Sequence, residues 1–559
     1  MLIILRKMVL NVPGIRSAST IPSYDEAVKA LNNLQSNAAY LQNVKTHNSA
    51  TNTNLKDTRK YLLRSGITME ELDKLSVIHV AGTKGKGSTC AFIEAIIRKH
   101  GFITGFYSSP HLINVRERLR INGQPMPEEE FTQSFWKVYE SLDKKKEHDT
   151  DMPQYFKFLT VLMFHVFLEV KVDVAIIEVG IGGEHDCTNI VRNPVCVGIT
   201  SLGLDHTMLL GSTLESIAFQ KSGIFKENTR AFTVSQPKEA MTILERRAKE
   251  KHCDLSIVTN YQSYNWRNGP PTLSIQSKVQ WCNASLAIDL SKTWISWKTQ
   301  NPNFGNDNGN NTTAPSTVTN QLNNNTTSST EVTRDLLNAS DSSTQRKILN
   351  ISNSKLQTKL NSSNSASESS LEKLQCSSTI SFEKVAEALS SCKWPGRTQI
   401  LCGKSMDFYV DGAHTIESIE FCVSWFKDVT RNSPERRYLI FNSTGARDSL
   451  KLLKPFRTLS FEKVFFVPNV AGTISKTDQQ NFSVTTQEQI RRCQWHCEIW
   501  GDGSTFANSV SEALERIKKD SSENSNLTNK PQVLITGSLH LVGAALALID
   551  PDLTMTTNY

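Results

Sequence analysis

Apolar and polar residues along the chain fall into alternating blocks that are typical of buried strands followed by helices. The apolar runs that predict strands in the first half lie at 77–81, 105–108, 172–179 and 195–201. A strongly apolar helix is expected over 156–168, and a helical repeat covers 91–97. Strands that alternate with helices favour an α/β fold with a mostly parallel sheet.

The same alternation returns in the last third of the chain after a long interruption. Between 299 and 379 the sequence is rich in Asn, Ser and Thr and poor in aromatic residues, so we expect it to be disordered. Beyond it, strands are predicted at 408–410, 438–441, 464–467 and 532–535, and helices at 381–390, up to 426, at 506–517 and near the C-terminus. We therefore predict two α/β domains, at 24–298 and 380–559, separated by an insert at 299–379.

A glycine-rich loop, residues 82–89, follows the first apolar run and precedes a helix. Glycines leave backbone N–H groups free to face an anion, and the helix N-terminus adds partial positive charge. Lys86 can reach phosphates, and Ser88 or Thr89 can support a metal ion or a phosphate oxygen. The loop differs from the G-x-x-x-x-G-K-[ST] pattern because Gly87 separates the lysine from the serine. Phosphate binding is the favoured interpretation, and a plain surface turn is the alternative.

Two chemically active side chains follow predicted strands at what should be one edge of the sheet. Glu178 stands near the end of the 172–179 strand, and His206 lies just past the 195–201 strand. Nucleotide-binding proteins place a magnesium ligand at the carboxyl end of such a buried parallel strand. A capped glutamate and a structural histidine are the alternatives. The neighbouring phosphate loop favours a magnesium site.

The composition argues against several classes of function. The 62 basic and 55 acidic residues give a net charge of +7, but no dense basic block indicates a nucleic-acid binder. No apolar stretch approaches the length of a membrane span. Eleven scattered cysteines indicate a reducing compartment. Cys493, His496 and Cys497 could hold zinc, but no second ligand pair stands nearby, so zinc is the minor alternative.

Residues 1–23 have the composition of a mitochondrial transit peptide. They contain Arg6, Lys7 and Arg16, no acidic residue, and many apolar and hydroxyl side chains. An apolar run at 2–5 could instead begin a secretory signal, but it breaks at Arg6. Met8 offers a second start that would shorten this leader, so we expect that only some of the molecules carry it.

These features fit a kinase, a nucleotide switch or an ATP-driven ligase, and a set of motifs narrows the choice. In chain order they are GTKGKGST (82–89), SSPHL (108–112), RER (116–118), EVGIGG (178–183), LDHT (204–207), QKSGI (220–224), WPGR (394–397) and DGAH (411–414). Together they resemble the folylpolyglutamate synthases of the Mur-ligase superfamily, and the motif sequences are most similar to those of the animal enzymes. The resemblance covers residues 24 to about 550 apart from the insert.

This resemblance implies a fold and a reaction. The fold would be an N-terminal P-loop Mur-ligase-like ATPase domain and a C-terminal Rossmann-like α/β domain. ATP would phosphorylate the γ-carboxylate of a reduced folate, tetrahydrofolate, and L-glutamate would attack the acyl phosphate to form an amide. The products would serve one-carbon metabolism and folate retention. The implied cofactors are ATP and Mg²⁺. The resemblance also allows a monovalent cation such as K⁺ as a further cofactor. The family also implies a monomer, without stable membrane insertion, in mitochondria (matrix or inner-membrane-associated) and cytoplasm.

The resemblance also assigns roles to individual residues. Those implied to bind nucleotide are Gly85, Lys86, Gly87, Ser88, Asn283, Arg397 and Asp411. Those implied to bind Mg²⁺ are Ser109, Glu178 and His206. Those implied to act in catalysis are Lys86, Lys221 and His414, and those implied to meet substrate are Arg118 and Ser538. Lys221 matches a lysine that is carbamylated in several relatives; an ordinary lysine facing phosphate is the alternative. Glu184 departs from the family pattern, which often has a neutral or basic residue there.

Two other functions compete with this interpretation. The first is dihydrofolate synthase, or an enzyme with both activities, which adds the first glutamate to dihydropteroate. The second is a P-loop regulator that binds nucleotide without turnover. The animal-like motifs argue against the first. The intact set of Lys86, Glu178, His206, Lys221 and Asp411 argues against the second.

Overall fold

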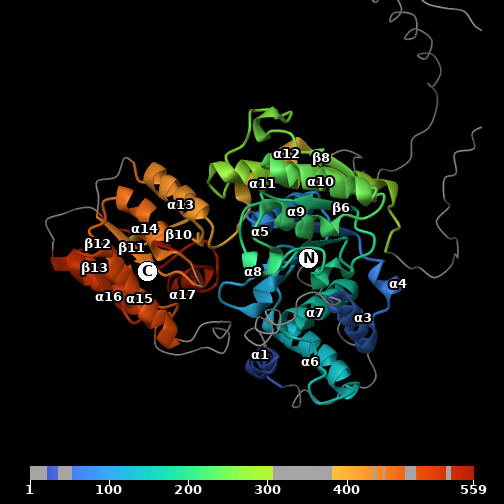
Figure 1. Cartoon of the computed structure of the whole chain (residues 1–559), viewed down its shortest axis with the longest axis horizontal. Coiled ribbons are helices and arrows are strands. Elements are labelled where there is room, and N and C mark those ends of the chain that lie inside the picture. Colours follow the sequence, from blue (N-terminus) through green and yellow to red (C-terminus); the bar gives the residue numbers. More distant parts are fainter. Residues whose placement is uncertain are drawn as a thin grey trace, which may run out of the picture. The chain divides into compact units, whose positions relative to one another are not determined.

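The computed structural model describes residues 22–34, 53–305, 380–431, 436–444, 447–472, 486–523 and 530–559. Within these residues the chain forms two α/β sheets with helices on their faces (Figure 1). The predicted α/β class is therefore confirmed. The leader up to residue 21 and the insert from 306 to 379 lie outside the described residues.

The first sheet has the strand order β4-β3-β2-β5-β1-β6-β7-β8. Its strands are β1 (Val77–Ala81), β2 (Thr104–Tyr107), β3 (Leu119–Ile121), β4 (Gln124–Pro125), β5 (Val174–Glu178), β6 (Cys196–Ile199), β7 (Arg230–Thr233) and β8 (Asp254–Ile257). The run from β2 to β8 is parallel, whereas β3 and β4 pair antiparallel at one edge. The predicted strands at 77–81, 105–108, 172–179 and 195–201 correspond to β1, β2, β5 and β6.

Both faces of this sheet are covered, which explains the continuous apolar runs. Ala175 and Ile177 of β5 face one core cluster, and Val174 and Ile176 face another, as the two-residue period of a strand requires. The helices of this domain are α1 (Tyr24–Asn33), α3 (Asn54–Ser65), α4 (Met69–Leu72), α5 (Lys86–Lys99), α6 (Glu128–Lys144), α7 (Tyr155–Val170), α8 (Thr207–Leu210), α9 (Leu214–Lys221), α10 (Lys238–Glu250), α11 (Lys278–Gln300) and α12 (Phe382–Ser391). In Figure 1, α3, α6 and α7 lie side by side.

Two long helices pack on opposite faces of the first sheet. The predicted helix at 156–168 is α7, which buries Phe158, Phe164 and Phe167 completely. Each such side chain contributes about 1.5–3 kcal/mol through its burial. On the other face α11 packs along α5 and buries Trp294. The helix α11 continues to Gln300, past the boundary at 298 that composition predicts for the first domain.

The second sheet has the order β13-β12-β11-β14-β10-β9, parallel except for β9. Its strands are β9 (Gln399–Cys402), β10 (Asp407–Asp411), β11 (Arg437–Phe441), β12 (Lys463–Phe466), β13 (Ser504–Phe506) and β14 (Gln532–Thr536). Its helices are α13 (Ile416–Val429), α14 (Ser449–Leu453), α15 (Thr486–Trp500), α16 (Val510–Glu523) and α17 (Leu539–Ile549). Short 3₁₀ turns occur at Val115–Arg118 (η2), Cys187–Ile190 (η3), Ser222–Ile224 (η4), Tyr261–Ser263 (η5) and Lys454–Thr458 (η6).

One predicted helix of the second domain begins at the wrong residue. The helix expected over 506–517 is α16, which begins only at Val510, and Phe506 instead ends the edge strand β13 beside Phe466. The cause is local: the Ser509 hydroxyl accepts from the N–H of Glu512, and the Glu512 carboxylate accepts from the N–H of Asn508. These two hydrogen bonds fix the chain at Asn508 and Ser509, so the helix starts after Ser509.

The cysteine and histidine side chains weighed as a zinc site lie on α15. Nε2 of His496 lies 3.3 Å from the Ser443 hydroxyl and 3.0 Å from the Ser449 hydroxyl, and its ring packs near those of Phe441 and Phe466. Among the described residues, no group of three or more histidine, cysteine, aspartate or glutamate side chains comes together in a way that could hold a metal ion. The histidine therefore serves the packing of α15 against the second sheet.

Candidate active site

The predicted site residues of the first domain gather where its parallel strands end. The register pairs Val80 with Glu178 and Ala81 with Ile199, so β1, β5 and β6 end at the same level. The loops that follow these strands, and the loop after β2, therefore meet at one edge. This is the edge where doubly wound α/β proteins bind their ligands.

The glycine-rich loop is held close to helix α11. Gly85 caps α5 with a φ of +93°, a conformation that side chains rarely adopt, and a Cβ there would lie 2.2 Å from Oδ1 of Asn283. Nδ2 of Asn283 donates to Gln280 (2.9 Å), whose side chain lies 3.5 Å from the Ser88 hydroxyl. The structure thus places Asn283, Gly85 and Ser88 together at the start of α5.

A buried carboxylate faces this loop from the end of β5. Oε1 of Glu178 lies 3.9 Å from Nζ of Lys86, and Oε2 accepts from the backbone N–H of Ser109 (3.1 Å). Burial raises the pKa of Glu178, and the charge of Lys86 works against that rise. The charges of Arg397 and Arg118 also oppose the rise, so this buried carboxylate lies in a basic environment. A carboxylate oxygen is a ligand that suits Mg²⁺.

A second lysine of the loop has a partner that the sequence did not predict. Nζ of Lys84 donates to Oδ2 of Asp205 (2.8 Å) and lies 3.0 Å from Nε2 of His414. Nδ1 of His414 lies 2.8 Å from the carbonyl oxygen of Gly412, so this nitrogen carries the proton and Nε2 accepts from Lys84. The sequence shows only that the loop contains two lysines. Their order does not predict which lysine faces phosphate and which one contacts Asp205 and His414.

Lys221 ends helix α9 and is almost fully buried. Burial, together with the charge of Lys86, lowers the pKa of its amine from 10.5 to about 7. A large share of the amine is therefore neutral at physiological pH, which makes it nucleophilic.

His206 lies at the start of α8 with a φ of +51°.

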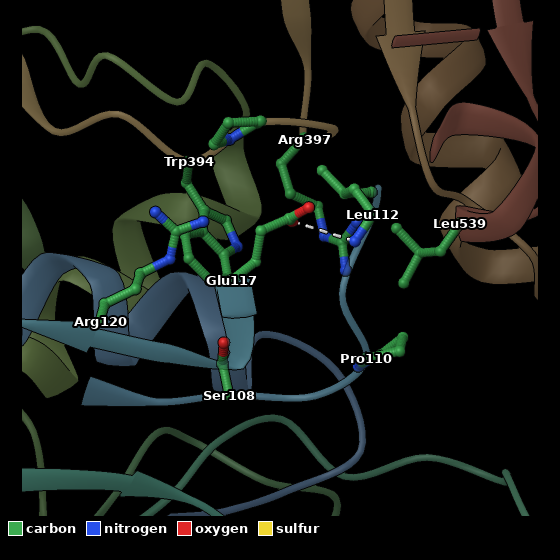
Figure 2. A pocket seen from close by; sticks show the side chains of 9 residues that line it. Ser108, Pro110, Leu112, Glu117, Arg120, Trp394, Arg397 and Leu539 are labelled. Atoms are coloured by element: carbon green, nitrogen blue, oxygen red, sulfur yellow. Dashed lines mark hydrogen bonds between the residues drawn. The ribbon is translucent and has the colours of Figure 1, made fainter. Parts of the chain in front are cut away.

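Arg397 and Asp411 meet in the second domain. Burial lowers the pKa of Arg397, and the charges of Asp411 and Glu178 oppose that shift. The Asp411 carboxylate accepts from the backbone N–H groups of Thr398 (2.8 Å) and Ala413 (2.9 Å), which ties together the two loops beside it. Figure 2 shows Arg397 at a small pocket. This pocket is lined by Ser108, Pro110, Leu112, Glu117, Arg120, Trp394, Pro395, Arg397 and Leu539.

The predicted substrate residues Arg118 and Ser538 come from different domains. Nε of Arg118 donates to Nδ1 of His111 (3.0 Å), and its guanidinium lies over the ring of Tyr155. Ser538 caps helix α17 by accepting from the N–H of His540. Burial lowers the pKa of His540 to about 4, and the charge of Arg118 contributes to that shift. A basic, largely buried environment suits an anionic substrate.

The unusual Glu184 does not belong to this group. Its carboxylate pairs with Arg247 (2.5 Å) on α10 and lies 3.8 Å from Lys251. Its charge is therefore used in packing α10 against the loop after β5, and it adds no acid to the predicted metal site.

A glycine-rich loop at the edge of one α/β domain, with Lys84 of that loop in contact with His414 of a second α/β domain, fits the class of two-domain ATP-dependent ligases. Residues 80–319 match the family model of the Mur ligase middle domain. The chain is 37% identical to the mitochondrial folylpolyglutamate synthase of Bos taurus over 599 residues, covering 95% of this chain and 93% of the relative. For the Homo sapiens protein of the same name the identity is 36%, with 95% and 92% covered.

A further relative carries a similar name, and two solved structures of lower identity share the fold. A putative folylpolyglutamate synthase of Caenorhabditis elegans is 34% identical, with 96% of this chain and 95% of the relative covered. The apo structure of the L. casei enzyme has a TM-score of 0.62 at 20% identity, covering 94% of this chain and 99% of that one. The Mycobacterium tuberculosis enzyme with ADP has a TM-score of 0.63 at 17% identity, with 94% and 98% covered. The chain belongs to the folylpolyglutamate synthase family and is an ATP-dependent amide-forming ligase.

Proposed function

We propose that this chain extends tetrahydrofolates with L-glutamate at the γ-carboxylate, through an acyl phosphate formed from ATP. The observation that carries the proposal is the buried Glu178 beside Lys86 at the glycine-rich loop. One structural neighbour is a complex of a folylpolyglutamate synthase with the ATP analogue AMPPCP and folate, which supports the same small-molecule substrates here. The products would supply one-carbon metabolism.

The chemistry explains why such a site needs no covalent nucleophile. A carboxylate is a poor electrophile because its leaving group would be oxide, and phosphorylation supplies a good one. The residues that would orient the triphosphate are Gly85, Lys86, Gly87 and Ser88 of the loop, together with Asn283, Arg397 and Asp411. Catalysis of this kind depends on positioning and on stabilising charge on the transferred phosphoryl group.

Ser109, Glu178 and His206 would hold Mg²⁺ in this proposal. When bound, the ion would neutralise charge on the phosphate oxygens. The buried carboxylate of Glu178 and its hydrogen bond from the backbone of Ser109 support this assignment. A monovalent cation such as K⁺ would be a further cofactor.

Glutamate would meet the acyl phosphate between Arg118, His414 and Ser538. Burial lowers the pKa of His414, Asp205 opposes that shift and the charge of Lys84 adds to it, while Nε2 of the ring lies 3.0 Å from Lys84 of the loop. The neutral form of the Lys221 amine, whose pKa is about 7, would attack carbon dioxide and lose a proton, which leaves a carbamate anion able to bind metal.

The first test of this assignment is Lys86→Ala. We expect incorporation of labelled glutamate into tetrahydrofolate to fall at least about 100-fold, because the lysine would no longer offset phosphate charge. Lys99→Ala, at the exposed far end of the same helix, is the matched control and should keep wild-type activity. A Lys86→Ala enzyme with full activity would show that the phosphate loop is wrongly assigned.

The same assay separates the two competing functions. Dihydropteroate as the acceptor, in place of tetrahydrofolate, measures dihydrofolate synthase activity. ATP binding without turnover on either acceptor would favour a P-loop regulator. The relatives that cover more than nine-tenths of this chain carry the name folylpolyglutamate synthase, which supports the ligase on tetrahydrofolate.

We propose that the protein acts in mitochondria, from the basic leader at 1–23, with a form in the cytoplasm that begins at Met8. Relatives from Bos taurus and Homo sapiens are named as mitochondrial, which supports the first location. Among the described residues no helix is both long and apolar enough to span a membrane. A reporter fused to residues 1–30 should enter mitochondria, and a purely cytosolic signal would refute this location.

The family resemblance implies a monomer, so light scattering of the purified protein should give the mass of a single chain.

A further inference from the structure

One buried carboxylate holds the loop that follows β2. Glu117 is 5% exposed and accepts hydrogen bonds from the backbone N–H groups of Leu112 (3.0 Å), Ile113 (2.8 Å) and Asn114 (2.6 Å). Figure 2 shows the bond to Leu112. Three consecutive N–H groups on one charged acceptor fix a backbone more firmly than single neutral bonds would. We call residues 108–114 the bridging loop.

The first end of the bridging loop lies at the phosphate site. The backbone N–H of Ser109 donates to Glu178 (3.1 Å), and the ring of His111 accepts from Arg118 (3.0 Å). A shift of this loop would therefore move a proposed magnesium ligand and a proposed substrate residue together.

The second end of the bridging loop contacts the second domain. Leu112 and Ile113 pack against the core cluster that includes Leu541 of α17. A Cβ on Gly543 would lie 2.0 Å from the carbonyl oxygen of Leu112, so α17 touches the loop backbone itself. The cap of α17 is Ser538, the second proposed substrate residue.

We propose that Glu117 is a positioning residue. It would hold the loop so that Ser109 at the phosphate site and the proposed substrate residues Arg118 and Ser538 keep a fixed relative position, and the acyl phosphate then reacts with the amine and not with water. This inference rests on the proposed function. In the productive step the amine nitrogen bonds to the acyl carbon, the bond from that carbon to the phosphate oxygen breaks, and the amine loses a proton. In the unproductive step a water oxygen bonds to the same carbon, and folate and phosphate are released.

Each route consumes one ATP, so the ratio of phosphate released to glutamate incorporated measures how the acyl phosphate divides between the amine and water. We expect this ratio to be about one in the wild type and to rise to about three or more in Glu117→Gln, which keeps the shape of the side chain but removes its charge. Glu128→Gln is the matched control because Glu128 is exposed and its nearest cation, Arg116, lies 3.6 Å away. Its ratio should stay at about one.

Gly543→Ala tests the same loop from the side of α17. Its added methyl group should also raise the ratio of phosphate released to glutamate incorporated. In the double variant this ratio should be higher than in either single variant but lower than the product of the two single increases, since both changes act on one loop. A merely structural role would lower phosphate release and glutamate incorporation in proportion. An unchanged ratio in Glu117→Gln, or in Gly543→Ala if the first variant does not fold, would overturn the inference. A wild type that incorporates no glutamate would instead refute the proposed function.

Discussion

The buried amine of Lys221 gives the folded protein a pH dependence of its own. Its pKa is about 7 in the folded chain, against 10.5 for an ordinary exposed lysine. Between these pH values the unfolded chain holds one more proton than the folded chain. The free energy of unfolding therefore rises with pH across this window, by at most about 1.4 kcal/mol per pH unit from this group. Below pH 7 the folded chain must bury an ammonium ion.

Lys221→Met removes this titration while keeping a side chain of similar size. We expect the wild type to gain stability relative to the variant when the pH rises from 7 toward 9, in urea unfolding experiments without bicarbonate. Bicarbonate should stabilise the wild type alone if a carbamate forms. Unfolding curves of the two proteins that shift in parallel with pH would show that the lysine amine is not held neutral.

Single residues differ in how far the local sequence predicts their surroundings. The position of Glu178 at the end of a buried strand is predictable, because it stands near the end of a continuous apolar run. The partners of Lys84 and Glu184 were not found, because Asp205, His414 and Arg247 lie far away along the chain. No local pattern encodes which of two neighbouring lysines turns toward phosphate.

At the scale of elements, the contact between α11 and the phosphate loop leaves no room at Gly85. Gly85→Ala would combine an unfavourable φ of +93° with a methyl group 2.2 Å from the Asn283 side chain. We expect the affinity for ADP, measured by calorimetry, to fall about tenfold or more because the loop must move.

Gly66→Ala provides the control for backbone strain. Gly66 has a φ of +106°, and an added Cβ would have no atom within 4 Å. It should cost about 1 kcal/mol of stability and leave ADP affinity unchanged. Equal losses of affinity in the two variants would mean that strain, and not the approach of α11, decides the effect.

Elements were predicted best where burial is continuous. All five residues of β1 and of β5 are buried, so their apolar runs mark both ends of each strand closely. The edge strand β13 has only three residues, all partly exposed, and it merged with the helical pattern that follows. Pairing with β12, which the local sequence does not reveal, is what makes it a strand.

At the scale of the whole molecule, the segment from 306 to 379 is predicted to be dispensable for catalysis. The flanking helices α11 and α12 both pack against α5, so a short connection can join them. Replacing the segment by a Gly/Ser linker of about 20 residues should leave kcat and KM within about threefold, since loop closure costs little free energy. A folded deletion variant with much lower activity would assign this segment a part in catalysis.

ATP-dependent addition of glutamate to a reduced folate can be measured directly. The most direct test is to incubate the purified protein with tetrahydrofolate and labelled L-glutamate, with and without Mg-ATP. Glutamate-extended folate should form only when Mg-ATP is present. Product formed equally well without Mg-ATP, or no product at all while ATP is bound, would contradict it.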